Sequence, residues 1–362
     1  MKKKAKVVIN GRFLTGPQTG VQRTAHEMVV ALDELIGSDE ISQTQISFVL
    51  LYNGSIKNPI ALKHIVLKRK GFLKGNLWEQ LELPIYSFGC LLVNMCTIAP
   101  LFKRRQIVFI HDVSFLVNKD FFSRGFRFWY TMAIPLLGKL AKAIVTVSMF
   151  SKKELVDLAG VDPQKITVIY NAAEHMLRFE APNLHFMDKI NKLKPYCLAV
   201  SSLGANKNFK GLTMAMKGMA MGKYQLVIAG GGVSALNNEL PNEDANYLGF
   251  VSDEELVYLY RNAALFIFPS FYEGFGIPPL EAMLLGCPVI AANTSSMPEV
   301  LGHACAYLDP YNPAIMRKNI FELINDPHRL ESLKQKGYGQ VAKYSWQKSA
   351  LQLYDLIENC NA

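Results

Sequence analysis

The sequence predicts an α/β protein made of two doubly wound, parallel-sheet (Rossmann-like) domains. Three observations support this fold class. The chain has 362 residues and is 50% hydrophobic, and chains above roughly 250–300 residues usually divide into more than one core. Short apolar runs alternate with longer helical patterns along its whole length, as in parallel sheets that are covered by helices on both faces. A polar stretch with two prolines, residues 181–195, interrupts this alternation near the middle.

Eleven apolar runs are predicted to be β-strands, because Gly, Asn, Ser or Pro bounds most of them, as βα turns require. In the first half these runs are Lys6–Asn10, Ile46–Tyr52, Leu91–Met95, Ile107–Ile110, Ile144–Val147 and Ile166–Tyr170. In the second half they are Cys197–Val200, Gln225–Ala229, Ala264–Phe268, Val289–Ala292 and Ala306–Leu308.

Helices are predicted between these runs. Apolar residues at alternating spacings of four and three place one apolar stripe on a helix after the first strand, and Trp346–Ile357 reads as a final helix. We expect one domain to comprise residues 1–172 with the C-terminal segment 346–362, and the other to comprise residues 173–345, with a cleft between them. The stripe of the first helix consists of Val21, Ala25, Met28, Leu32 and Leu35.

Charge is distributed unevenly between these domains. Residues 1–172 hold 23 basic and 12 acidic side chains, a surplus of +11, whereas the remainder holds 16 and 18, a balance of −2. Such a surplus attracts an anionic partner: nucleic acid, an anionic membrane or an anionic acceptor molecule. The basic clusters are dispersed through the first half, at residues 2–6, 68–70, 103–105 and 152–153.

One segment of the first half, residues 121–142, interleaves Arg and Lys with aromatic side chains. On its own it fits an RNA-binding surface, an interfacial helix, or a helix that packs its aromatics in the core and solvates its cations. The sequence contains no recognisable nucleic-acid-binding module, so we do not expect nucleic acid as a partner.

Membrane insertion and export are not expected either. Residues 85–102 are largely apolar and precede a basic cluster, like a membrane-spanning helix with its positive flank. Gly89, Asn94 and Pro100 interrupt this segment, which favours a buried strand and a loop. The basic start lacks the apolar run of a secretory signal, and the six cysteines lack metal-binding spacing. We therefore expect a cytoplasmic protein with reduced cysteines, no bound metal and no other cofactor.

The most informative segment is 268–299, in which a strand ends, a glycine-bearing loop follows and two prolines open a helix. Helix N-termini carry free N–H groups and partial positive charge, so this loop suits an anion such as a diphosphate. Glu273 in the loop and Glu281 in the expected first helical turn would repel phosphate. They are better suited to accept hydrogen bonds from hydroxyl groups, as on sugars, so the segment predicts a sugar-nucleotide site.

This segment resembles the signature of the retaining family-4 glycosyltransferases, which have the GT-B fold. The signature, E-x-F-G-x-x-x-x-E-A-M-x-x-G-x-P-V-I-A, is matched from Glu273 to Ala291. The resemblance implies that Glu273 is catalytic and lies beside the donor sugar, and that Glu281 accepts hydrogen bonds from the nucleotide ribose. It also implies that backbone N–H groups of the loop hold the donor; these belong to Gly274, Phe275 and Gly276.

The resemblance extends over nearly the whole chain. It implies that His111, at the end of a strand, is a second catalytic residue that reaches the transferred sugar, and that Lys207 binds the donor phosphates. Gly20 lies at the family's first loop and is assigned to donor binding. No arginine precedes Lys207 at the spacing that many members share. The loop that resembles the base-binding segment contains Gly249, Phe250 and Val251.

The function implied by the resemblance is that of a retaining, metal-independent hexosyltransferase. It would move a hexose or deoxyhexose, such as mannose or rhamnose, from a nucleoside-diphosphate sugar to a hydroxyl of a growing, polyprenyl-diphosphate-linked glycan. The implied setting is bacterial surface polysaccharide assembly, of O-antigen lipopolysaccharide or capsule, peripherally on the inner face of the cytoplasmic membrane. The basic first domain would then face the acceptor and an anionic membrane surface.

Two other readings stay open at the level of the sequence. The GT-B fold also serves phosphorylases and sugar epimerases, which makes another sugar-nucleotide enzyme the closest rival. A catalytically silent nucleotide-sugar-binding protein could keep Glu281 and Lys207 but would not need His111 or Glu273. A nicotinamide dehydrogenase and a P-loop nucleotidase are not expected, because the sequence lacks both glycine-rich fingerprints.

Overall fold

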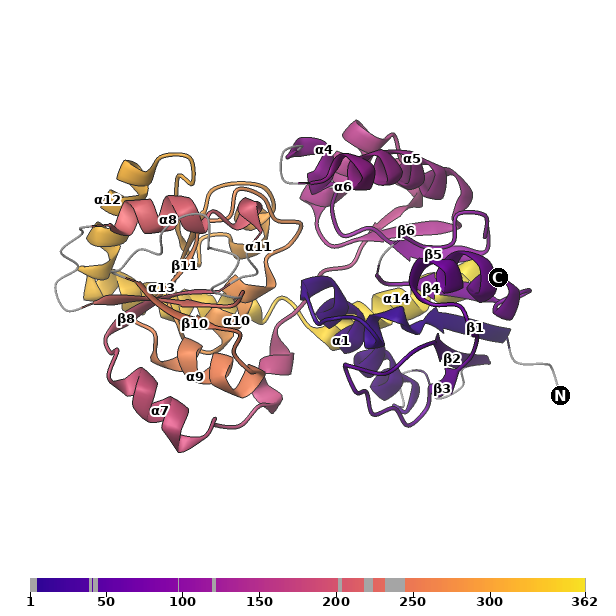
Figure 1. Cartoon of the computed structure of the whole chain (residues 1–362), viewed down its shortest axis with the longest axis horizontal. Helices are drawn as coiled ribbons and strands as arrows, with labels where there is room; N and C mark the ends of the chain where they lie inside the picture. Colours follow the sequence, from indigo (N-terminus) through magenta and orange to yellow (C-terminus); the bar gives the residue numbers. More distant parts are fainter. Residues whose placement is uncertain are drawn as a thin grey trace. The chain divides into compact units, whose positions relative to one another are not determined.

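The computed structural model describes residues 5–38, 41, 45–96, 98–118, 122–200, 204–217, 224–231 and 245–361. The chain divides into two compact units, Met1–Asn171 with Trp346–Ala362 (unit 1) and Ala172–Ser345 (unit 2). Each unit is built around one sheet whose strands all pair in parallel (Figure 1). The predicted α/β class with two doubly wound sheets is confirmed.

The sheet of unit 1 has seven strands in the order β3-β2-β1-β4-β5-β6-β7. The chain starts at β1 in the interior of the sheet, builds outwards to one edge, and then returns to build the other edge, which is the doubly wound pattern. The strands are β1 Ala5–Asn10, β2 Ile46–Tyr52, β3 Val66–Arg69, β4 Leu91–Asn94, β5 Gln106–Phe109, β6 Ala143–Thr146 and β7 Ile166–Val168.

The helices of unit 1 include the predicted amphipathic helix, whose Ala25, Met28 and Leu32 are fully buried. The last helix of the chain packs against it, and Ser349 donates to the backbone carbonyl of Tyr170 at 2.6 Å. The helices are α1 Gly20–Ile36, α2 Gly75–Leu77, α3 Leu83–Tyr86, α4 Ser114–Val117, α5 Arg124–Leu140, α6 Met149–Ala159 and α14 Trp346–Asn361.

The sheet of unit 2 has six strands in the order β10-β9-β8-β11-β12-β13. They are β8 Tyr196–Val200, β9 Gln225–Ala229, β10 Ala245–Gly249, β11 Leu265–Phe268, β12 Val289–Ala292 and β13 Ala306–Leu308. The helices are α7 Leu184–Asn191, α8 Phe209–Met216, α9 Asp253–Asn262, α10 Ile277–Leu284, α11 Met297–Leu301, α12 Pro313–Ile324 and α13 Pro327–Val341.

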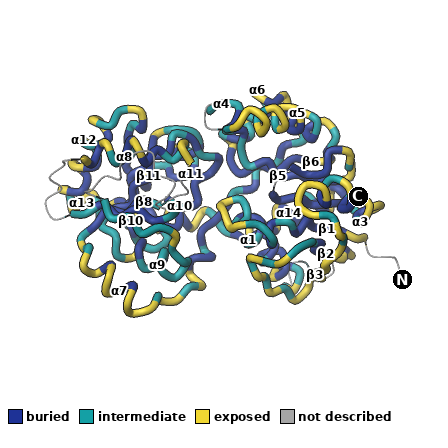
Figure 2. Tube along the Cα trace, viewed as in Figure 1, coloured by how far each residue is buried: buried dark blue, intermediate teal, exposed yellow. Residues whose placement is uncertain are grey.

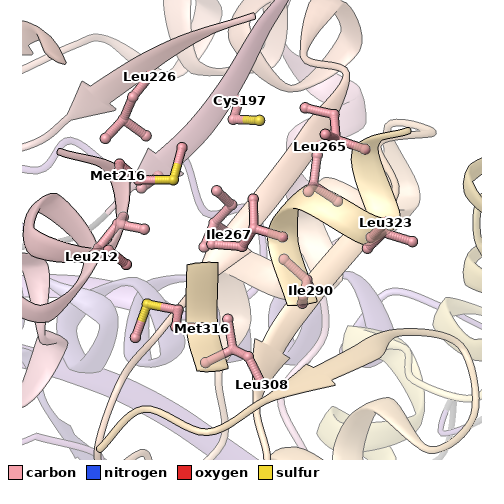
Figure 3. Close-up of a cluster of buried hydrophobic side chains, with 14 of the residues drawn as sticks. Cys197, Leu212, Met216, Leu226, Leu265, Ile267, Ile290, Leu308, Met316 and Leu323 are labelled. Carbon is pink, nitrogen blue, oxygen red and sulfur yellow. The ribbon is translucent and has the colours of Figure 1, made fainter. Parts of the chain in front are cut away.

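The core of unit 2 shows why its strands read as continuous apolar runs. Leu265 and Ile267 of β11 join a cluster with side chains of α8 and α12 (Figure 3). Phe266 and Phe268 point to the other face, where Phe266 packs edge-on against Tyr260 of α9. Both faces of β11 are therefore covered, as in α/β folds generally, and this strand is coloured as buried in Figure 2.

All eleven predicted strands are present, to within one or two residues at their ends. The middle of segment 85–102 forms the buried strand β4, as predicted. No helix among the described residues is long and apolar enough to cross a bilayer. The six cysteines are free thiols, and all except Cys90 are buried.

Candidate functional site

The candidate site of unit 2 is formed by loops that follow β8, β11 and β12. The side-chain amide of Asn208 donates to the carbonyl of Pro269 at 3.2 Å. The N–H of Glu273 donates to Ser295 Oγ at 3.0 Å, and Ser296 Oγ donates to the Glu273 carbonyl at 2.9 Å. These bonds fix the backbone of the glycine-bearing loop at the carboxyl edge of the sheet, where parallel α/β sheets bind ligands.

Two of the predicted site residues are in direct contact here. Lys207 Nζ lies 2.6 Å from Glu273 Oε1, and their side chains are 18% and 12% exposed. A charge-assisted hydrogen bond of this length is among the stronger polar contacts in proteins. The ammonium group has three donors and uses one of them on Glu273. The pair is therefore ordered and still reachable by a ligand that brings negative charge to Lys207.

Glu281 lies at a second polar cluster of unit 2. The sequence-based placement in the first helical turn is wrong: α10 begins at Ile277, so Glu281 is its fifth residue and the first turn contains no acidic side chain. Its Oε1 accepts from His175 Nε2 and its Oε2 accepts from the hydroxyl of Tyr260, each at 3.1 Å. Burial, and then the charge of Glu281, raise the pKa of Tyr260, which stays a donor.

This geometry leaves Glu281 able to bind hydroxyl groups. The residue is only 7% exposed, and each carboxylate oxygen spends one hydrogen-bonding position on a protein donor. Because a carboxylate offers about four positions, the residues that the structure describes use roughly half of them. His175 and Tyr260 fix the orientation of the group in advance.

The start of α10 is shaped by glycine and proline. Gly276 has φ of +90°, a backbone conformation that is strained for any residue with a Cβ. A Cβ placed on it would also lie 2.3 Å from Met297 Cε, so the end of that side chain would have to move. Pro278 and Pro279 occupy the second and third helical positions and have no N–H. Anion binding by the backbone at this helix is thus restricted to N–H groups before Pro278, together with the helix dipole.

The end of β10 and the loop that follows it carry the other residues assigned to the donor. Gly249 has φ of +72°, and its carbonyl accepts from the N–H of Gly230 at 2.7 Å. Phe250 is 87% exposed, and Val251 is half-buried. The next residue, Ser252, caps α9 with a full capping box. An exposed aromatic ring on an anchored loop is suited to stack against a planar base.

His111 belongs to unit 1 and follows β5. Its Nε2 lies 2.9 Å from the carbonyl oxygen of Met95. A carbonyl only accepts, so Nε2 carries the proton and Nδ1 of the neutral ring is an acceptor. Burial lowers the pKa of His111, and the hydrogen bond to Met95 acts in the opposite direction. The ring is thus held as a neutral acceptor for a hydroxyl group.

Comparison with known proteins identifies the family. Residues 86–175 match the model of Glycosyltransferase Family 4, and residues 181–340 match that of Glycosyl transferases group 1. O-antigen chain mannosyltransferase B of Escherichia coli is 30% identical over 261 residues, which cover 68% of each chain. This chain belongs to glycosyltransferase family 4.

Further comparisons support the fold of this glycosyltransferase. The serotype-specific mannosyltransferase WbdA of Escherichia coli is 26% identical over 264 residues, 68% of this chain but only 32% of that protein. The structure of Anabaena HepE with UDP-glucose aligns with a TM-score of 0.72 and 16% identity, over 98% of this chain and 99% of that one. The predicted GT-B fold is confirmed.

Unit 1 of the glycosyltransferase contains a polar and aromatic cavity that the sequence did not predict. It has a volume of about 330 Å³ and is lined by the pair Arg12–Glu79 and by aromatic residues of α5 that include Trp129 and Tyr130. Arg12 Nη1 donates to Glu79 Oε2 at 2.5 Å, and Asn10 donates to the other oxygen at 2.7 Å. A partly exposed cation therefore faces a cavity with an aromatic wall.

Gly20, the remaining predicted site residue, is the exposed first residue of α1. A Cβ placed on it would meet nothing within 4 Å. The fold itself does not require glycine at this position, in contrast to Gly276. The assignment of Gly20 to ligand binding stays a prediction.

The structure adds residues that no sequence pattern indicated. His175 and Tyr260 flank Glu281, and Ser295, with φ of +52°, holds the loop of Glu273. A lone His, Tyr or Ser carries no spacing signal, so only the folded arrangement reveals them. A second cavity of about 350 Å³ lies beside the same loops, lined by Asn293, Thr294 and residues 307–311.

Proposed function

We propose that this glycosyltransferase transfers mannose, with retention of anomeric configuration, from a nucleoside-diphosphate sugar to a hydroxyl of a growing, lipid-linked bacterial surface glycan. The binding of the sugar donor is supported by the contact between Lys207 and Glu273 at the carboxyl edge of the unit 2 sheet. The choice of mannose is supported by relatives named as mannosyltransferases of O-antigen chains.

The donor diphosphate would bind at Lys207 and at the backbone N–H groups before Pro278. The ammonium group of Lys207 has three donors, so it can bind the diphosphate and Glu273 at the same time. As the bond from the anomeric carbon to the phosphate oxygen breaks, negative charge grows on that oxygen. Preorganised cationic donors stabilise such charge in a partly dehydrated site. This scheme uses a side-chain cation rather than a metal ion for the leaving group.

The nucleoside would be held by Glu281, which accepts from the ribose hydroxyls, and by stacking on Phe250. Glu273 would orient the sugar hydroxyls in unit 2, and neutral His111 in unit 1 offers a further acceptor for a hydroxyl group. In a retaining transfer the acceptor oxygen attacks the face that the diphosphate leaves. The acceptor proton then passes to the departing phosphate oxygen, so that the two bonds and the proton balance without a further reactant.

The acceptor would bind in unit 1, in the cavity beside Arg12 and Trp129. Aromatic walls with a few fixed polar groups are typical of small-molecule sites, and the faces of aromatic rings favour the partial positive charge of C–H groups. Among the described residues, the only side-chain partner of Arg12 is Glu79, which leaves guanidinium donors for sugar hydroxyls.

A panel of nucleotide sugars tests this function. Purified protein would be incubated with the nucleoside-diphosphate forms of mannose, rhamnose, glucose, galactose and fucose, with and without a polyprenyl-diphosphate-linked glycan. Release of nucleoside diphosphate would be followed. We expect release from the mannose donor, accelerated by the acceptor. Release of nucleoside diphosphate only from another donor would overturn the choice of mannose. Release from none of the donors would favour a binding protein that lacks catalytic activity.

A further inference from the structure

The helical segment from α2 to α3 presents large apolar side chains to solvent. Residues 75–86 form α2, a π-helical turn (Trp78–Glu82) and α3. Leu77, Leu81 and Ile85 recur every four residues along it and are 60%, 55% and 69% exposed, and Phe88 just beyond is 87% exposed. Monomeric soluble proteins rarely leave such residues together in water, and clusters of this kind mark interaction surfaces.

Two neighbouring loops extend this apolar face. Lys103 Nζ donates to the carbonyl of Ser87 at 2.8 Å, which brings Phe102, itself 89% exposed, to the end of α3. On the other side, the N–H of Leu73 donates to Glu82 at 3.0 Å. We define the α2–α3 surface as Phe72, Leu77, Leu81, Ile85, Phe88 and Phe102 with the cations Lys70, Lys74, Lys103 and Arg104.

The charges on this surface are of one sign. Lys70 Nζ lies 4.3 Å from the ring centre of Tyr86, and Lys74 and Arg104 are exposed. The two acidic residues of the helix, Glu79 and Glu82, are 1% and 6% exposed and bind donors inside unit 1. The face turned to solvent is thus apolar with a basic rim, the pattern of a surface that lies in a membrane interface.

We propose that the α2–α3 surface docks this protein onto an anionic lipid bilayer. Apolar side chains would enter the boundary between headgroups and acyl chains, and the surrounding Lys and Arg would bind anionic headgroups. The same helix lines the unit 1 cavity through Asn76, Glu79 and Gln80. Docking would therefore hold that cavity close to the headgroups, where a lipid-linked acceptor presents its glycan; only this last consequence rests on the proposed function.

A vesicle sedimentation assay tests the proposal without donor or acceptor. The full chain would be mixed with vesicles of pure phosphatidylcholine, or of phosphatidylcholine and phosphatidylglycerol in equal parts. We expect binding to the anionic vesicles at least tenfold stronger than to the neutral ones, and weaker at high salt. The double variant Ile85→Glu and Phe88→Glu should bind anionic vesicles at least tenfold more weakly.

The matched control is the double variant Leu158→Glu and Leu184→Glu, which adds the same charge at exposed apolar positions of α6 and α7. It should bind like the wild type. Equal binding by both double variants would overturn the proposal, as would wild-type binding to neither kind of vesicle. Association of the wild type into a dimer that Ile85→Glu and Phe88→Glu abolish, without vesicle binding, would assign the surface to a protein partner instead.

A second arm separates this surface from α5, whose Phe128 and Met132 are also exposed. Loss of vesicle binding with Phe128→Glu and Met132→Glu, but not with the α2–α3 variant, would overturn the placement. Transfer to a short soluble acceptor should survive Ile85→Glu and Phe88→Glu. If vesicle binding fails while that transfer is measured, only the docking proposal fails; if binding occurs and no donor reacts, only the proposed function fails.

Discussion

The pair of Lys207 and Glu273 allows structural and catalytic roles to be separated by a double-mutant cycle. The side chains are 18% and 12% exposed, between the fully buried pairs whose disruption costs about 3–5 kcal/mol and the exposed pairs worth at most about 1 kcal/mol. We expect Lys207→Met and Glu273→Gln each to lower the free energy of unfolding by about 2 kcal/mol, by leaving the partner charge unpaired.

The double variant removes both charges together. Its loss of stability should be smaller than the sum of the single losses by at least about 1 kcal/mol, because no unpaired charge remains. In thermal unfolding, the loss of about 2 kcal/mol corresponds to a decrease in Tm of about 4–8 °C for a unit of this size. The melting transition of the full chain, measured by calorimetry, gives these values.

Activity should behave differently. Lys207→Met should lower kcat/KM for the donor by about 10²–10³-fold, the usual effect of removing one donor to developing charge, and the double variant should recover none of it. Recovery of transfer in the double variant would refute the catalytic assignment. Additive losses of stability would refute the ion pair itself.

Four further predictions concern single positions. Glu281→Gln should raise the donor KM by about 10–100-fold, since hydrogen bonds to a charged acceptor contribute about 1.5–3 kcal/mol, with a smaller change in kcat at saturating donor. Gly276→Ala should destabilise unit 2 by about 1–3 kcal/mol because of its positive φ. The control Gly339→Ala lies in α13, where an added Cβ would meet no atom of another part of the chain within 4 Å, and should stabilise the unit by about 0.5–1 kcal/mol in calorimetry. Burial lowers the pKa of His111 below its ordinary 6.5, so the unfolded chain binds more protons below that pH and stability falls there; denaturant titrations should show a weaker decline for His111→Gln. Trp129→Ala should raise the acceptor KM about tenfold, or about 1.4 kcal/mol, and leave the donor KM unchanged.

Each of these predictions has a contrary outcome. An unchanged donor KM in Glu281→Gln would show that the Glu281 carboxylate does not bind the ribose. Equal stability changes in the two glycine variants would contradict the backbone strain expected of a Cβ at position 276. Parallel pH profiles for the wild type and His111→Gln would show that the histidine is not held neutral by burial. A change in the donor KM of Trp129→Ala would contradict the assignment of Trp129 to an acceptor site in unit 1.

Most of the fold was predictable because central strands of a parallel sheet are covered on both faces. Such strands must be apolar throughout, as β11 is, and they stand out in the sequence. The two strands that were missed, β3 and β10, are edge strands with exposed or half-exposed residues. Lys68 and Arg69 in β3 were assigned to a basic cluster, because nothing in the local sequence pattern shows that their backbone pairs with β2.

The candidate site was predictable where a motif fixes spacing along the chain. Glu273, Gly276 and Glu281 fall in one signature, and the structure places them on one loop and helix. The contact of Lys207 with Glu273 joins residues 66 positions apart, and the sequence carries no signal for that distance. The same holds for His175, which reaches Glu281 across 106 positions and has no motif of its own.

The charge surplus of the first half was informative only in part. It indicated an anionic partner, and one hypothesis was that this partner binds at the aromatic segment 121–142. In the structure α5 turns Trp129 and Tyr130 to the unit 1 cavity and leaves Phe128 and Met132 exposed. A separate group of exposed apolar side chains forms the α2–α3 surface, beside other basic clusters. Exposure of a side chain depends on tertiary packing, which composition does not report.

Lys207 and Glu273 are proposed to serve a retaining transfer of a sugar from a nucleotide donor. The most direct measurement is an NMR time course of transfer from nucleoside-diphosphate mannose, which reads the anomeric configuration of the first product formed and the rate for wild type and Glu273→Gln. We expect a product with the donor's configuration and a strong loss of rate in the variant. An inverted product, or equal rates for the two proteins, would contradict this proposal.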